Sequence, residues 1–168
     1  TNAIPAPEAA VLCNIGLDHM TYLGDTVEKI AATKSGIIKP GCEAVLYPCA
    51  PSVAEIVSAR CRSCGITLHP VDMDALSPLA HSLDGQAFNF GDLTDLHLPL
   101  LGRMQLYNAA TALTVTEVLR RRGWHIDENA VRQGLAQVRW PVRFEVVRRE
   151  PLVVMDGGHN PQCMEALV

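Results

Sequence analysis

The sequence contains no apolar run of the roughly 20 residues that a helix needs to span a membrane, and no signal-peptide pattern follows Thr1. It also lacks a basic excess: the formal net charge is -4, which argues against a broad nucleic-acid-binding surface. Hydrophobic residues still make up 48% of the 168 residues and charged residues 19%, so a packed core can form. These features predict a soluble, cytoplasmic protein with no membrane and no nucleic-acid partner.

The six cysteines lack the regular spacing of a disulfide-stapled secreted domain. Cys61 and Cys64 form a CRSC pair, which is the pattern of a redox couple or of half a zinc site. A zinc site would need a second close pair or a nearby histidine cluster, and neither follows. We therefore interpret the cysteines as reduced structural thiols, which also favours the cytosol.

The two ends of the chain fall inside predicted elements. Thr1 to Pro7 has the composition of a connection into a strand, and Pro161 to Val168 that of the first turns of a helix. This favours an internal segment of a longer protein, and the alternative is that disordered ends were trimmed.

Apolar runs and amphipathic segments alternate along the first half of the chain, which is typical of a parallel sheet with crossover helices. The predicted elements are a strand over 9–15, a helix over 25–36, a strand over 43–47, a helix over 52–64 and a strand over 66–71.

The pattern changes from Gln86 onward. The Gly91-Asp92 pair predicts a turn between two strands that form an antiparallel extension at the sheet edge, and Trp140-Pro141 breaks the chain, which predicts domains over 1–140 and 141–168. The predicted elements are strands over 86–90 and 95–100, helices over 104–122 and 127–138, and strands over 143–148 and 152–156.

Two groups in the first half have the residue types of a site. A buried strand ends in a loop that holds Asp18 and His19, and ligands of open α/β sheets bind beyond the carboxyl ends of the strands. Lys34 shares the apolar face of its predicted helix. Local hydrogen bonds in the loop and a lysine snorkelling from the helix end are the structural alternatives.

Three further groups lie in the second half. Asn108 falls in the first turns of a helix, where its amide can read the edge of a base, and capping or packing is the alternative. Arg143 lies just past the chain break, where an arginine can reach a phosphate bidentately. Asp156 ends a strand before two glycines, which suits either a ribose contact or a turn.

These groups occur within four stretches, NIGLDHMTYLGDTVEKIAATKSGIIKPG, LLGRMQLYNAATAL, WPVRFEVV and MDGGHNPQ. In wording and order they resemble the folylpolyglutamate synthase/dihydrofolate synthase family of the Mur ligase superfamily. The resemblance implies an α/β fold: a Mur-ligase-like ATP-binding central domain, followed by the start of a Rossmann-like C-terminal domain that binds glutamate. Val142 stands where the family usually has glycine.

The resemblance also implies roles for individual residues. His19 would be a Mg²⁺ ligand, and Lys34 would be carbamylated and help to hold a second Mg²⁺. Asn108 would contact adenine, Arg143 the ATP phosphates and Asp156 the ribose. The last residue in this series, His159, would lie near the active cleft.

The implied reaction uses ATP to activate a carboxylate as an acyl phosphate, which the amino group of L-glutamate attacks. The implied substrates are L-glutamate and dihydropteroate or a reduced folate, the cofactors are ATP and Mg²⁺, and the full-length enzyme would be a monomer. The sequence contains no GxxxxGK[ST] phosphate loop, so we expect the chain alone to be inactive.

Two other functions stay open at this point. A Mur-type amino-acid ligase of cell-wall synthesis would share the metal histidine, the lysine and the Asn–Arg–Asp series. A truncated, non-catalytic nucleotide-binding module would lack the phosphate loop in its natural gene as well.

Overall fold

The computed structural model describes residues 3–17, 23–159 and 163–164, and the chain forms two compact units. The first unit comprises Thr1–Val71 with Thr111–His125, and the second comprises Asp72–Ala110 with Ile126–Val168. Helix α4 (Arg103–Arg121) contributes its first turns to the second unit and the rest to the first. Among the described residues no helix is both long and apolar enough to cross a membrane. The division into domains at Trp140 stays a prediction.

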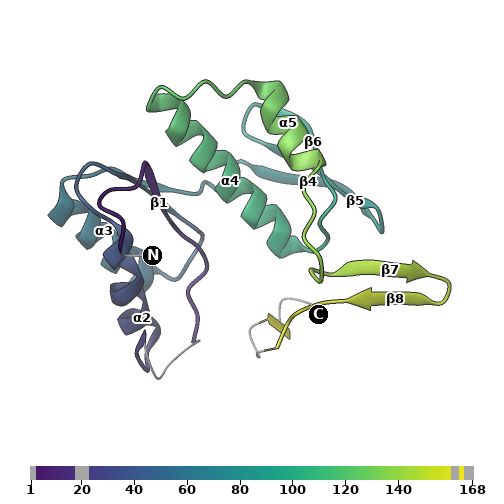
Figure 1. Cartoon of the computed structure of the whole chain (residues 1–168), viewed down its shortest axis with the longest axis horizontal. Helices are drawn as coiled ribbons and strands as arrows, with labels where there is room; N and C mark the ends of the chain where they lie inside the picture. Colours follow the sequence, from purple (N-terminus) through teal and green to yellow (C-terminus); the bar gives the residue numbers. More distant parts are fainter. Residues whose placement is uncertain (1–2, 18–22, 160–162, 165–168) are drawn as a thin grey trace. The chain divides into compact units, whose positions relative to one another are not determined.

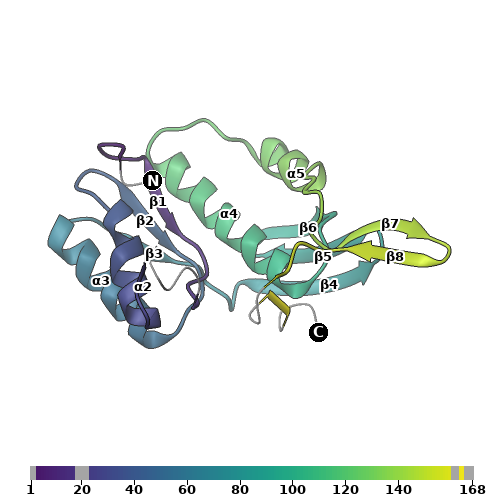
Figure 2. The same cartoon turned by 60° about the horizontal axis from the view of Figure 1, so that its bottom comes forward.

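The first unit contains a three-stranded parallel sheet in the order β1-β2-β3, whose strands are labelled in Figure 2 and whose two helices are labelled in Figure 1 as well. Its strands are β1 (Ala9–Leu12), β2 (Glu43–Leu46) and β3 (Leu68–Pro70), and helices α2 (Val27–Lys34) and α3 (Pro51–Cys64) connect them. The predicted order of strand, helix, strand, helix and strand is therefore confirmed.

The ends of the two crossover helices follow from local chemistry. Thr26 caps α2 by accepting the Lys29 N–H at 3.2 Å, while Asp25 forms an ion pair with Lys29. Helix α2 then tightens into a 3-10 turn, η1 (Ser35–Ile37). Helix α3 ends at Gly65, whose φ of 66° is the left-handed conformation that favours glycine.

One face of the parallel sheet packs against α2 and α3. Side chains alternate along β1 and β2, so Ala10, Leu12, Ala44 and Leu46 all point to this face. The helices supply apolar partners that are almost completely buried, and these are Ile30, Ala31, Val53, Val57 and Cys61.

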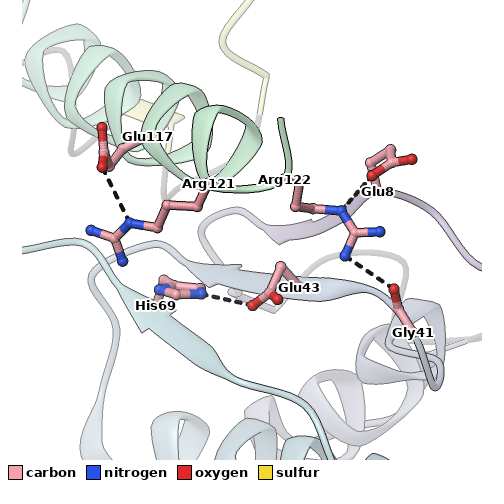
Figure 3. A network of polar contacts seen from close by, with 7 residues as sticks. All are labelled: Glu8, Gly41, Glu43, His69, Glu117, Arg121 and Arg122. Atoms are coloured by element: carbon pink, nitrogen blue, oxygen red, sulfur yellow. Dashed lines mark hydrogen bonds and ion pairs between the residues drawn. The ribbon is translucent and has the colours of Figure 1, made fainter. Parts of the chain in front are cut away.

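The end of α4 lies over the other face of the sheet, where a group of residues makes polar contacts; we call this group the polar seam (Figure 3). Glu43 of β2 and His69 of β3 are joined at 2.8 Å between Oε2 and Nε2, and both are largely buried. Arg122 contacts the Glu8 carboxylate and donates to the Gly41 carbonyl at 3.2 Å. The polar seam consists of Glu8, Gly41, Glu43, His69, Glu117, Arg121 and Arg122.

The second unit contains an antiparallel sheet in the order β4-β5-β6. Its strands are β4 (Leu76–Ser82), β5 (Gly85–Phe90) and β6 (Leu93–Leu98). The predicted antiparallel pair is confirmed, but its predicted place at the edge of the parallel sheet is wrong. Strand β4, which the sequence pattern does not predict, supplies the third strand of this separate sheet.

Two further elements complete the second unit. Helix α5 (Glu128–Ala136) is capped by Asp127, as predicted, and lies against β6, where Arg132 donates to the Thr94 carbonyl at 2.8 Å. Strands β7 (Glu145–Arg149) and β8 (Leu152–Met155) pair antiparallel as a hairpin (Figure 2). Both predicted strands are present, each slightly shorter than expected.

Candidate functional site

A pocket of about 350 Å³ opens at the carboxyl end of β1. Strand β1 and the residues after it supply one wall, and the end of α2 supplies the other. This is the edge of a parallel sheet at which α/β folds bind ligands. The lining residues that carry polar or reactive groups are Cys13, Asn14, Thr33 and Lys34.

Lys34 is the last residue of α2 and lines this pocket half-buried. The neighbouring hydroxyls fix the helix end. Thr33 Oγ1 shares its one proton between the Leu23 carbonyl at 3.2 Å and the Lys29 carbonyl at 3.0 Å, and Ser35 Oγ donates to the Ala32 carbonyl at 2.8 Å. Lys34 therefore lines the pocket from the end of its helix. Its carbamylation stays a prediction.

Asp18 and His19 lie outside the described residues. Among the residues that the structure does describe, no group of three or more His, Cys, Asp or Glu side chains could hold a metal ion. The metal-ligand role predicted for His19 therefore stays a prediction.

Asn108 lies in the first turns of α4, where it is exposed and its Nδ2 donates to Gln105 Oε1 at 3.0 Å. Gln86, which was not among the predicted site residues, fixes the loop before this helix. Gln86 is 8% exposed, and its Nε2 donates to the carbonyls of Leu100 at 2.7 Å and Gly102 at 3.0 Å. A glutamine beside a strand turn gives no sequence signal that it holds a loop 14 to 16 residues away.

Asp156 follows β8 and is half-buried. Its carboxylate accepts two backbone N–H groups, from Gly158 to Oδ1 at 2.6 Å and from Phe144 to Oδ2 at 2.8 Å. These contacts are those of a turn, which was the alternative to a ribose contact for Asp156. Each oxygen keeps a second lone pair, so these contacts leave room for a hydroxyl donor.

Arg143 is exposed in the turn that Asp156 contacts. His159 is exposed as well, and its Nδ1 lies 2.8 Å from the Gly157 carbonyl oxygen. The structure therefore places Arg143, Asp156 and His159 in the second unit and Lys34 in the first.

All six cysteines are free, as predicted, and their reactivity should differ sharply. Burial raises the pKa of the Cys61 thiol, and the nearby Cys42 and Cys64 raise it further, whereas Cys13 is exposed at the pocket. We expect iodoacetamide at pH 8 to modify Cys13 at least about tenfold faster than Cys61, because the thiolate is the reactive form and a buried group needs local opening. Peptide mass spectrometry measures both rates.

The same pKa gives the sign of a stability change with pH. A neutral Cys61 stabilises the fold fully below the unfolded-state pKa of about 8.5, and this stability is lost as the pH rises through the higher folded-state value.

The control for the iodoacetamide experiment is the unfolded chain, because in denaturing urea the thiols of Cys13 and Cys61 should react at similar rates. Equal rates under native conditions would contradict the burial of Cys61.

Comparison with known proteins gives a consistent set of relatives. The family model described as the Mur ligase middle domain matches residues 2–116. The folylpolyglutamate synthase of Lacticaseibacillus casei is 37% identical over 175 residues, which cover 100% of this chain and 40% of that protein. The dihydrofolate synthase/folylpolyglutamate synthase of Mycobacterium tuberculosis is 34% identical over 180 residues, covering 99% of this chain and 37% of the relative.

A solved structure agrees with these sequences. The complex of a folylpolyglutamate synthase with AMPPCP and folate superposes with a TM-score of 0.87 at 32% identity, covering 98% of this chain and 42% of that one. The chain thus spans about 40% of the length of the relatives it matches. By the family model and by these likenesses, the chain belongs to the Mur ligase family, in its folylpolyglutamate synthase/dihydrofolate synthase branch.

Proposed function

We propose that this chain carries part of the ATP site of a ligase that joins L-glutamate to dihydropteroate, to folates or to both through an acyl phosphate. The observation that carries the proposal is the half-buried Lys34 in a pocket at the carboxyl end of β1. Support comes from the folylpolyglutamate synthase complex with AMPPCP and folate, which matches 98% of the chain. A cell-wall ligase is less well supported, because the relatives described above are folate enzymes.

Each residue of the proposed site has a group suited to one part of ATP. Asn108 offers an exposed amide to the adenine edge, and Asp156 can accept a ribose hydroxyl through its second lone pairs. Arg143 is exposed, and no hydrogen bond or ion pair engages its guanidinium within the described residues, so the group is available to a phosphate. The exposed imidazole of His159 lies against the carbonyl of Gly157, the residue that follows Asp156.

The side-chain atoms that Lys34 offers decide whether Mg²⁺ could be held beside it. Lys34 as an ammonium would repel a cation, whereas a carbamate on its amine offers the oxygen atoms that Mg²⁺ prefers. Carbamylation would replace the positive charge of the ammonium with a negative charge, which a bound Mg²⁺ would offset. His19 would be a ligand of one Mg²⁺ and a carbamylated Lys34 would help to hold a second, and these ions would offset charge on the phosphate oxygens.

Two further features of this chain would assist the reaction. An arginine aimed at the transferring phosphoryl group stabilises the negative charge that builds up there. Apolar side chains also line the pocket, namely Val11, Leu12, Ile15 and Ile37. They would help to keep water away from an acyl phosphate, which water would hydrolyse.

We expect the 168-residue chain by itself to form no ADP above background when mixed with ATP, Mg²⁺, L-glutamate and dihydropteroate. The reason is that the sequence holds no glycine-rich loop to cradle the phosphates. A coupled ADP assay measures the rate, with the heat-denatured chain as control. Turnover by the native chain would contradict this expectation.

The substrate is tested in a polypeptide that joins this chain to a phosphate-loop segment and to a complete glutamate-binding domain, which we call the full-length ligase. It should add glutamate to dihydropteroate or a folate, and a muramyl substrate should give no product. Product from the muramyl substrate alone would replace the folate assignment with the cell-wall one, and no product from either substrate would favour a non-catalytic module.

A further inference from the structure

The turn that presents Arg143 has an unusual backbone. Val142 has a φ of 60° and Phe144 a φ of 48°, so both neighbours of Arg143 lie in the left-handed region. This conformation is rare outside glycine and asparagine, and for a β-branched residue such as Val142 it is an outlier. Such a turn persists only where surrounding contacts hold it in place.

Three contacts hold this turn, and two of them come from carboxylates. Glu145 Oε2 accepts the Val142 N–H at 2.9 Å, and Asp156 Oδ2 accepts the Phe144 N–H at 2.8 Å. On the remaining side, the Gly157 N–H donates to the Val142 carbonyl at 2.8 Å. Arg143 lies between these fixed groups, and its own side chain is exposed.

We propose that Glu145 is a positioning residue for Arg143, and that its carboxylate keeps the 142–144 turn in the conformation that directs the guanidinium to a phosphate. Glu145 begins β7, so the hairpin fixes its backbone while the side chain reaches back three residues to Val142. Asp156, the residue directly after β8, holds the other end of the same turn. The two carboxylates therefore tie the position of Arg143 to the β7–β8 pairing.

This inference rests on the proposed function, because it assumes that Arg143 meets a phosphate. In the full-length ligase we expect Glu145→Ala to lower kcat/KM for ATP about tenfold, which is the size of one hydrogen bond to a charged group. Glu145→Gln keeps an acceptor oxygen and should stay within about threefold of the wild type. Asp92→Ala, which removes an exposed carboxylate from the β5–β6 turn, is the matched control and should change nothing.

A double-mutant cycle separates the positioning role of Glu145 from the phosphate role of Arg143. Arg143→Ala should lower kcat/KM for ATP by about 100-fold, and adding Glu145→Ala should cause no further loss, since the positioned group is already gone. A wild-type rate for Arg143→Ala would refute the phosphate role of Arg143. A large loss for Arg143→Ala, with an independent tenfold loss on adding Glu145→Ala, would refute positioning and leave the phosphate role intact.

Amide exchange in the 168-residue chain provides a measurement that needs no activity. The Val142 N–H should exchange at least about tenfold faster in Glu145→Ala than in the wild type or in Glu145→Gln. Unchanged exchange in Glu145→Ala would overturn the proposal, because the turn would then be held without the carboxylate.

Discussion

Replacing Phe88 with alanine is expected to lower the free energy of unfolding of the second unit by about 3–5 kcal/mol. Phe88 lies in the middle strand of the antiparallel sheet, is 0% exposed, and pairs in register with the buried Leu96 on β6. The smaller alanine side chain would leave a cavity that Leu96 and the surrounding side chains can fill only in part. Urea unfolding followed by hydrogen exchange of peptides from 85–98 reports on this unit alone.

Leu79→Ala is the matched control, because Leu79 lies on the neighbouring strand β4 and is 54% exposed. Its removal should change the same free energy by less than about 1 kcal/mol. Equal losses for the two variants would mean that the core of the second unit does not centre on Phe88.

Replacing Lys34 with alanine is expected to lower kcat of the full-length ligase by about 10²–10³-fold, the loss typical of removing one group that stabilises transition-state charge. Apart from the Cys13 thiol, Lys34 is the only ionisable side chain among the described residues that line the pocket. The proposed carbamate would supply the negative charge there. Steady-state rates at saturating ATP and glutamate measure the effect.

Two variants distinguish the carbamate from an ordinary lysine. Lys34→Arg keeps a positive charge that carbon dioxide does not modify, and it should be as inactive as Lys34→Ala. Lys34→Glu restores a carboxylate at this position and should recover part of the rate. Full activity in Lys34→Arg would show that the cation itself is what the site requires. Carbon NMR with labelled bicarbonate provides a direct check, since a carbamate signal should appear in the wild type and vanish in Lys34→Arg.

The parallel half of the fold could be predicted because each of its parts has a local cause. Strands β1 and β2 are short apolar runs, Thr26 can cap a helix, and Gly65 can end one. Lys34 was predictable in the same way, since it is spaced from Ile30 and Ala31 by three to four residues and must share their face.

The second unit was harder to predict because its order depends on contacts between distant residues. Strand β4 contains Pro78 and is exposed over nearly all of its length, so it shows no apolar alternation. Only pairing with β5 makes it a strand. The positive φ of Val142 was equally hidden, although the glycine usual at this position in the family fits the conformation observed.

The side-chain amide of Gln86 makes this unit sensitive to chemical ageing at a single atom. Both carbonyls that it binds accept hydrogen bonds from its nitrogen. Deamidation would exchange that nitrogen for a carboxylate oxygen, leaving acceptors facing acceptors and a negative charge beneath the loop that leads into α4. With only 8% of Gln86 exposed, folding itself shields the bond from hydrolysis. The damage should therefore accumulate in molecules that spend time unfolded, and a chain damaged in that state would lose the contacts that order this loop.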